Sequence, residues 1–192
     1  MQPRKTMHSS GVVLQPDKGY DKPCSYSIGL DASITSFGVY CAPLGNADWF
    51  GFAVCSEAKE GSDTTRALEI ADEVISHLNG LRHPISIVTF EDYGPINRTS
   101  GKIAVRAEIC GILKHHFLRT LRVPVIMVPP NSLKQYATGK GNASKEAMLD
   151  AAAALGYYPE TSDEADAFFA ASVGRCIMQN VRTGVSFHRV NP

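Results

Sequence analysis

The chain has 192 residues, a hydrophobic content of 44% and a formal net charge of zero at pH 7. This length and composition predict one globular domain with a sizeable core over residues 23–180, between polar tails at 1–22 and 181–192. No apolar run approaches the roughly 20 residues that a membrane span needs. The five cysteines lack the spacing of a zinc site, which favours reduced thiols in a cytoplasmic protein.

The first half of the chain predicts three strands and a helix. Apolar runs at residues 26–31, 37–42 and 49–55 are separated by turn residues, and they predict an antiparallel meander. Apolar side chains at helical spacing then predict a helix over residues 64–78, and Gly80 follows it as a stop signal.

The second half alternates strands and helices. Strands are predicted at 85–91 and 123–128, on either side of a long helix at 102–121. A helix that Asn142 or Ser144 caps is predicted to run to Leu155, and Ser162 is predicted to cap the last helix, which runs to about Gln179. This order predicts an α/β fold with a mixed five-stranded sheet that helices flank.

Four carboxylates stand where an α/β protein would place a metal site. Asp31 and Glu91 each end an apolar strand, and ligand sites of such sheets gather at the carboxyl ends of strands. Asp163 and Asp166 are three residues apart at the start of the last helix, so they project from nearly one face. Carboxylate oxygens suit Mg²⁺ or Mn²⁺, and a pair of such ions promotes phosphodiester hydrolysis. Together, the four acids predict a metal site.

Each acid taken singly has an ordinary structural explanation. Asp31 can cap a turn, and Asp163 can be a first-turn residue that the helix dipole favours. Asp166 can be a solvated surface residue, and we expect Glu164 to be one. Metal binding is favoured by the combination of positions, not by any one of the acids.

Positive charge is concentrated in the middle of the chain. Between Arg98 and Lys145 there are nine basic residues and one acidic residue, Glu108, which gives this segment a formal charge of +8. Such a segment favours a polyanion partner, and a solvated helix face is the alternative. Lys134 and Lys145 lie on either side of a Gly-rich loop, where a lysine can contact a phosphate or stabilise developing charge. Ordinary surface lysines are the alternative.

Several motifs in this order resemble those of RuvC-type Holliday junction resolvases, which are nucleases of the ribonuclease H-like superfamily. The resemblance covers residues 25–176. The most selective part is the lysine–loop–lysine segment followed by Asp-x-x-Asp-Ala. The matching stretches are Ile28-Gly29-Leu30-Asp31 with Thr35 and Gly38, Phe90-Glu91, Leu133-Lys134-Gln135, Gly139-Lys140-Gly141-Asn142-Ala143-Ser144-Lys145 and Asp163-Glu164-Ala165-Asp166-Ala167.

The resemblance implies a ribonuclease H-like fold and a homodimer that binds a four-way junction or other branched DNA. It implies paired nicks that depend on Mg²⁺, or on Mn²⁺ in its place, and that leave 5′-phosphate and 3′-hydroxyl ends. The implied metal ligands are Asp31, Glu91, Asp163 and Asp166, which with Lys145 would be the catalytic residues. The candidate DNA-binding residues are Tyr93, Arg98, Lys102, Lys134, Lys140 and Lys145. The helix over 102–121 would supply much of the dimer interface through its small residues Ala104, Ala107, Cys110 and Gly111, for which a core-facing stripe is the alternative.

The sequence departs from the family pattern in two places. Ala32-Ser33 follows the first aspartate where these resolvases commonly have Pro-Gly. Tyr93 is the candidate for an aromatic wedge that stacks on a junction base, with loop packing as the alternative. These changes fit a relaxed, phage-type nuclease for branched DNA.

Two other classes of protein remain as alternatives. Residues 29–38 also resemble the first phosphate loop of actin-like and sugar-kinase phosphotransferases, but such enzymes need a second domain and a second Gly-rich motif. A non-catalytic branched-DNA-binding relative is expected to have lost acids, and all four are present here.

Overall fold

The structure is a computed structural model that describes residues 24–34, 36–45, 48–54, 63–92 and 101–190, without the side chains of residues 101–102. Its centre is a mixed sheet in the order β3-β2-β1-β4-β5-β6. β1 pairs with β4, and β4 with β5, in parallel, whereas the other three pairings are antiparallel. The strands are β1 (Tyr26–Asp31), β2 (Phe37–Pro43), β3 (Phe50–Val54), β4 (Ile85–Glu91), β5 (Val125–Val128) and β6 (His188–Val190).

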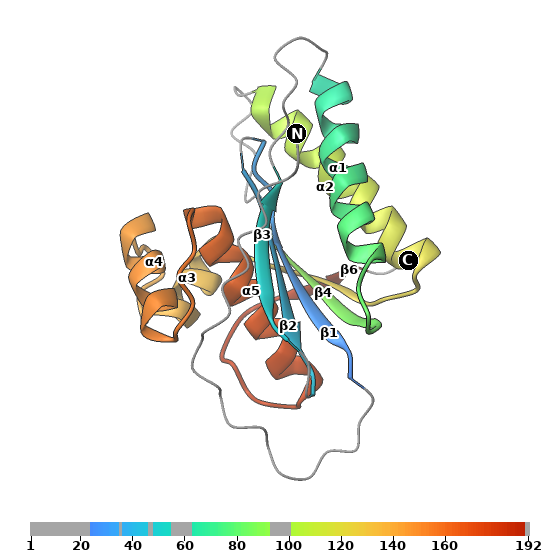
Figure 1. Cartoon of the computed structure of the whole chain (residues 1–192). Helices are drawn as coiled ribbons and strands as arrows, with labels where there is room; N and C mark the ends of the chain where they lie inside the picture. The colour runs from blue at the N-terminus through green and yellow to red at the C-terminus, as the bar shows by residue number, and fades with distance from the viewer. Residues whose placement is uncertain (1–23, 35, 46–47, 55–62, 93–100, 191–192) are drawn as a thin grey trace.

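The sheet has helices on both faces (Figure 1). One face is covered by α1 (Asp63–Asn79) and by α2 (Gly101–His115), which continues into the π-helical turn η1 (His116–Thr120). The other face is covered by α3 (Pro130–Thr138), α4 (Lys145–Ala154) and α5 (Ser162–Met178). Each layer has its own cluster of buried apolar side chains. No helix in these described stretches is long and apolar enough to cross a bilayer.

The predicted α/β class and mixed sheet are confirmed, but the predicted number of strands is wrong. The sixth strand, β6, lies within the stretch predicted to be a polar C-terminal tail. It pairs antiparallel with β5, where Val125 faces Val190 and Met127 faces His188. Because β5 would otherwise be an edge strand with unpaired backbone groups, this return of the chain covers that edge.

Two local assignments also differ from the sequence predictions. α3 lies in the stretch after Pro129-Pro130 where no helix was predicted, and Pro130 takes a first-turn position, where proline is favoured. The cap of α5 is Thr161 and not Ser162, because the Thr161 side chain accepts a hydrogen bond from the Glu164 backbone N–H. For α4, Ser144 is the cap, and its side chain accepts a hydrogen bond from the Ala147 N–H.

The central strand β1 shows how the two layers meet. All six of its residues are buried, as expected for a strand that is covered on both faces. Side chains alternate along a strand, so Ile28 and Leu30 enter the core beneath α1 and α2, whereas Gly29 faces α5. A Cβ atom at Gly29 would clash with the Ala167 carbonyl and the Ala171 backbone nitrogen. Glycine at this position therefore lets the backbone of α5 lie directly on the sheet.

Candidate active site

Two of the acids are placed by the alternation of side chains along β1 and β4. Asp31 is the last residue of β1 and shares the α5 side of the sheet with Gly29. Glu91 is the last residue of β4, and the parallel register that pairs Leu30 with Phe90 puts these two strand ends side by side. Because both strands end at the same edge, the two carboxylates converge there.

Helix α5 supplies the other two acids. Its first turn lies against β2, where a Cβ at Gly38 would clash with the backbone carbonyl of Asp163. This close approach places Asp166, one turn along the helix, beside the strand ends. Carboxylate oxygens of Asp31, Glu91 and Asp166 lie within 4.8 Å of one another. Asp163 is outside this tight group of three but lines the same cavity.

The acids open into a cavity of about 340 Å³ that also contains three basic side chains. Lys134 comes from α3 and Lys145 from the first turn of α4, whereas Arg106 comes from α2 on the opposite face of the sheet. Basic side chains from both helical layers therefore border one acidic centre. The lining residues are Asp31, Ser33, Ile34, Glu91, Arg106, Lys134, Lys145, Met148, Asp163 and Asp166.

Burial is the largest cause of raised pKa values among these acids, and mutual repulsion adds to it. The pKa of Asp31 lies well above its usual range because the residue is buried beside Glu91, Asp166 and Asp163, and Arg106 opposes this rise. Burial and repulsion by Asp166 raise the pKa of Glu91 to about 8. Burial raises the pKa of Asp166 to about 6, against the opposing charges of Lys134 and Lys145. Without a cation, these three carboxyl groups therefore hold their protons more tightly than solvated acids do.

The carboxylate oxygens fit a hard divalent cation. Asp31 Oδ1 and Asp166 Oδ1 are both buried and have no hydrogen-bond partner. The contact from Arg106 Nη2 to Asp31 Oδ1 is 3.7 Å, which is too long for a hydrogen bond. Buried oxygens without partners are unfavourable, and a metal ion satisfies them by direct coordination. Asp31, Glu91 and Asp166, with Asp163 on the wall, are therefore suited to hold Mg²⁺ or Mn²⁺.

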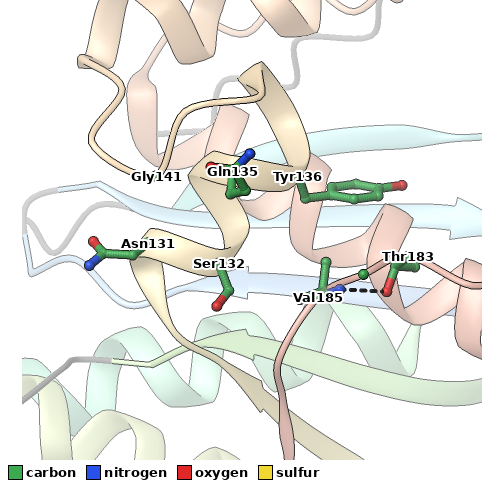
Figure 2. Close-up of a pocket in the computed structure, with 8 residues that line it drawn as sticks. Asn131, Ser132, Gln135, Tyr136, Gly141, Thr183 and Val185 are labelled. Atoms are coloured by element: carbon green, nitrogen blue, oxygen red, sulfur yellow. Dashed lines mark hydrogen bonds between the residues drawn. The ribbon is translucent and has the colours of Figure 1, made fainter.

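A larger cavity, of about 620 Å³, lies between α3 and the segment that follows α5 (Figure 2). Asn131, Ser132, Gln135 and Tyr136 border it from α3, and Thr183 accepts a hydrogen bond from the Val185 backbone N–H on the other side. Its described lining residues include no acid and no base. The groups needed for phosphodiester chemistry are therefore in the smaller cavity.

Comparisons with protein-family models and with curated proteins find no match. Among solved structures, the chain is similar to a Thermus thermophilus RuvC structure, with a TM-score of 0.62 and 23% identity over 80% of this chain and 96% of that one. It is equally similar to T. thermophilus RuvC in complex with Holliday junction substrate, with a TM-score of 0.62 and 22% identity over 81% of this chain and 96% of that one. The chain has the fold of RuvC. The resemblance seen in the sequence is thus confirmed for the ribonuclease H-like fold.

Within this RuvC fold, the residues predicted from sequence fall into three groups. Six line one cavity: Asp31, Glu91, Asp163, Asp166, Lys134 and Lys145. Lys140 is exposed in the loop between α3 and α4 and does not line the cavity. Tyr93 and Arg98 lie outside the described residues, and the side chain of Lys102 is not described, so their predicted roles remain predictions.

The structure adds one residue to the site and corrects another. Arg106 was counted only as part of the basic segment, yet its guanidinium forms an ion pair with Asp31. The prediction that Glu164 is a solvated surface residue is wrong, because its side chain is buried. Glu164 accepts hydrogen bonds from the Tyr157 hydroxyl at 3.4 Å and the Glu160 backbone N–H at 3.2 Å. Glu164 thus joins the start of α5 to the preceding loop.

The helix predicted to form a dimer interface has two different faces. Cys110 is buried in the core of the RuvC fold, which agrees with the core-facing alternative for this residue. Ala104 and Gly111 are exposed, and a Cβ at Gly111 would meet no atom within 4 Å. The exposed face of α2 is therefore the part of this helix that a second subunit can reach.

Proposed function

We propose that this chain is a metal-dependent endonuclease that resolves Holliday junctions and other branched DNA by paired nicks. The observation that carries the proposal is the convergence of Asp31, Glu91 and Asp166 within 4.8 Å, at the carboxyl edge of a sheet with the fold of RuvC. A RuvC of this fold has been solved with a Holliday junction substrate, which supports branched DNA as the substrate class.

In this proposal the four acids hold Mg²⁺, or Mn²⁺ in its place. When bound, such ions supply activation of water and stabilisation of the leaving oxygen. The chain itself positions the DNA: Lys134 and Lys145 reach into the cavity from α3 and α4, where each can bind a phosphate next to the scissile bond. The nick leaves a 5′-phosphate and a 3′-hydroxyl. Tyr93, Arg98, Lys102 and Lys140 are proposed further contacts to DNA.

Paired nicking requires two such cavities, so we propose that the chain acts as a homodimer. Each chain contributes one acidic cavity, and a four-way junction offers two symmetry-related strands. The exposed face of α2 around Ala104 and Gly111 is the proposed contact, because its small residues allow another subunit to approach closely.

The test is a nicking assay on a labelled four-way junction, a Y-fork and a linear duplex, in Mg²⁺, in Mn²⁺ and in EDTA. We expect metal-dependent nicks in the branched substrates that DNA ligase reseals, because ligation requires 5′-phosphate and 3′-hydroxyl ends. Asp166→Asn should abolish nicking, since it removes one ligand of the cluster. Asp150→Asn is the matched control, because Asp150 is exposed on α4 and does not line the cavity.

Absence of metal-dependent nicking in every branched substrate would refute the proposal. Full nicking by Asp166→Asn would remove this acid from the catalytic set. Hydrolysis of ATP without nicking of DNA would instead favour the phosphotransferase alternative.

A further inference from the structure

Arg106 enters the acidic centre from the opposite layer of the molecule to the two lysines. It follows the buried Val105 on α2, and its side chain reaches Asp31, the last residue of β1. Its Nη2 atom is 3.7 Å from Asp31 Oδ1, the most buried carboxylate of the cluster. In the absence of metal, the guanidinium is thus the nearest described counter-charge to Asp31.

The contacts of this arginine are incomplete. Its Nε atom is buried and has no hydrogen-bond partner, and the contact with Asp31 exceeds hydrogen-bond length. An arginine that is built to hold a carboxylate permanently normally makes two parallel hydrogen bonds with it. The Arg106 side chain is also 35% exposed, and it lines the cavity. Arg106 thus forms an ion pair with Asp31, but no hydrogen bond in the described residues fixes its guanidinium there.

The position of Arg106 conflicts with a metal ion. Asp31 Oδ1 is one of the oxygens that would coordinate the metal, and a divalent cation and a guanidinium repel each other at such short range. Arg106 is anchored through α2, whose residues Val105 and Ile109 are in the core, so only its side chain is free to move. Its charged end must therefore turn away from Asp31 when a metal arrives, and it then needs another anionic partner.

We propose that Arg106 is a displaceable cation of the acidic centre: its guanidinium lies against Asp31 in the metal-free protein, and the metal drives it onto a phosphate of the bound DNA. This inference rests on the proposed function for its phosphate partner. Because the phosphate offers a new partner to the displaced guanidinium, DNA and metal bind with positive coupling. Without DNA, the protein thus binds metal more weakly than the same four acids would bind it if Arg106 were absent.

The first measurement is Mn²⁺ affinity of the full chain without DNA, by titration calorimetry. Arg106→Gln removes the competing charge, so we expect it to bind Mn²⁺ roughly tenfold more tightly than the wild type, within the range typical of coupling between sites. Arg106→Lys keeps the charge and should stay near the wild-type affinity. Arg119→Gln is the matched control, because Arg119 is an exposed arginine of the same layer that does not line the cavity.

The second measurement is the rate of junction nicking at saturating Mn²⁺. Here Arg106→Gln should be slower than the wild type by roughly tenfold or more, since a charged donor to the phosphate is lost. Tighter metal binding together with slower nicking is a combination that loss of structure would not produce. Thermal unfolding in EDTA shows whether the variant remains folded.

The outcomes separate this inference from the proposed function. If Arg106→Gln binds Mn²⁺ no more tightly than the wild type, Arg106 does not compete with metal and the inference is overturned. Tighter binding with an unchanged nicking rate would overturn the transfer to phosphate. If the wild type binds Mn²⁺ but nicks no DNA, the proposed function fails, while tighter binding by Arg106→Gln still supports displacement. A wild type that binds no Mn²⁺ would overturn both.

Discussion

The metal-free protein should lose stability as the pH rises from about 5 to about 7, and Glu91 should be a principal cause. Its pKa is raised from 4.5 to about 8 by burial and by repulsion from Asp166. A carboxyl group whose pKa is higher in the folded chain than in the unfolded chain binds its proton more tightly when folded. Folding is therefore favoured at low pH, and this contribution is lost as the pH rises from the unfolded pKa toward the folded one.

The size of this loss of stability follows from the pH range between the pKa of Glu91 in the unfolded chain and its pKa in the folded chain. Between the two pKa values the unfolded chain releases a proton that the folded chain retains, so each pH unit lowers the free energy of unfolding by about 1.4 kcal/mol. Over the two units from about pH 5 to about pH 7, Glu91 alone contributes a loss of roughly 2 to 3 kcal/mol. Asp166 acts in the same direction up to its pKa of about 6.

The assay is urea unfolding in EDTA at both pH values, for the wild type and for Glu91→Gln. Glutamine has the shape of the protonated acid and does not titrate, so the variant should lose roughly 2 to 3 kcal/mol less than the wild type over this range. Glu108→Gln is the control, since Glu108 is an exposed carboxylate of α2 that does not line the cavity. Mn²⁺ should restore the stability of the wild type at pH 7, because it binds only the folded state strongly.

Two results would contradict this reasoning. One is a wild type whose free energy of unfolding in EDTA is as large at pH 7 as at pH 5. The other is a Glu91→Gln variant with the same pH dependence as the wild type, which would mean that Glu91 is ionised without cost at the strand end.

Three further changes test the packing and the charges around the site. Gly29→Ala should lower the free energy of unfolding by about 2 kcal/mol or more in urea, because its Cβ meets the α5 backbone; an unchanged free energy of unfolding would exclude the close contact. Glu164→Ala should lower stability by about 1 to 3 kcal/mol by leaving buried donors unpaired, and the exposed Glu160→Ala should not. Lys134→Ala should reduce the slope of the logarithm of the junction-binding constant against the logarithm of salt concentration by about one, which corresponds to one released counterion. An unchanged slope would show that Lys134 does not contact a phosphate.

The placement of the acids was accessible from sequence because it depends on local rules. Apolar runs that end in Asp31 and Glu91 define strand ends, and parallel pairing brings such ends to one edge of a sheet. The spacing of Asp163 and Asp166 likewise needs only the periodicity of a helix. The elements that the sequence did not predict depend instead on their neighbours in the folded structure. β6 is a three-residue strand whose first two residues are exposed, and it is a strand because the edge of β5 is there to pair with it.

Helix α3 and Glu164 show two other limits. α3 is nine residues long with one fully buried side chain, Leu133, so it has little apolar periodicity to detect. Glu164 follows Asp163 in the first turn of α5, where acids are usually solvated, and nothing in the sequence indicates that Tyr157 folds back onto it. The contact between Arg106 and Asp31 likewise depends on tertiary structure and is not visible in the sequence, because the two residues come from different layers.

The packing that assembles the acidic centre also holds its carboxylates close enough to repel one another. Gly29 and Gly38 let the backbone of α5 approach β1 and β2 with no side chain between them, and this contact holds Asp163 and Asp166 near Asp31. The raised pKa values show that the resulting cluster opposes folding, whereas the apolar cores on both faces of the sheet favour it. A looser helix would relieve the repulsion, but it would also separate the ligands. The stability that is lost at this edge is therefore the condition for the proposed metal site, whose carboxylate oxygens are already in place before a cation binds.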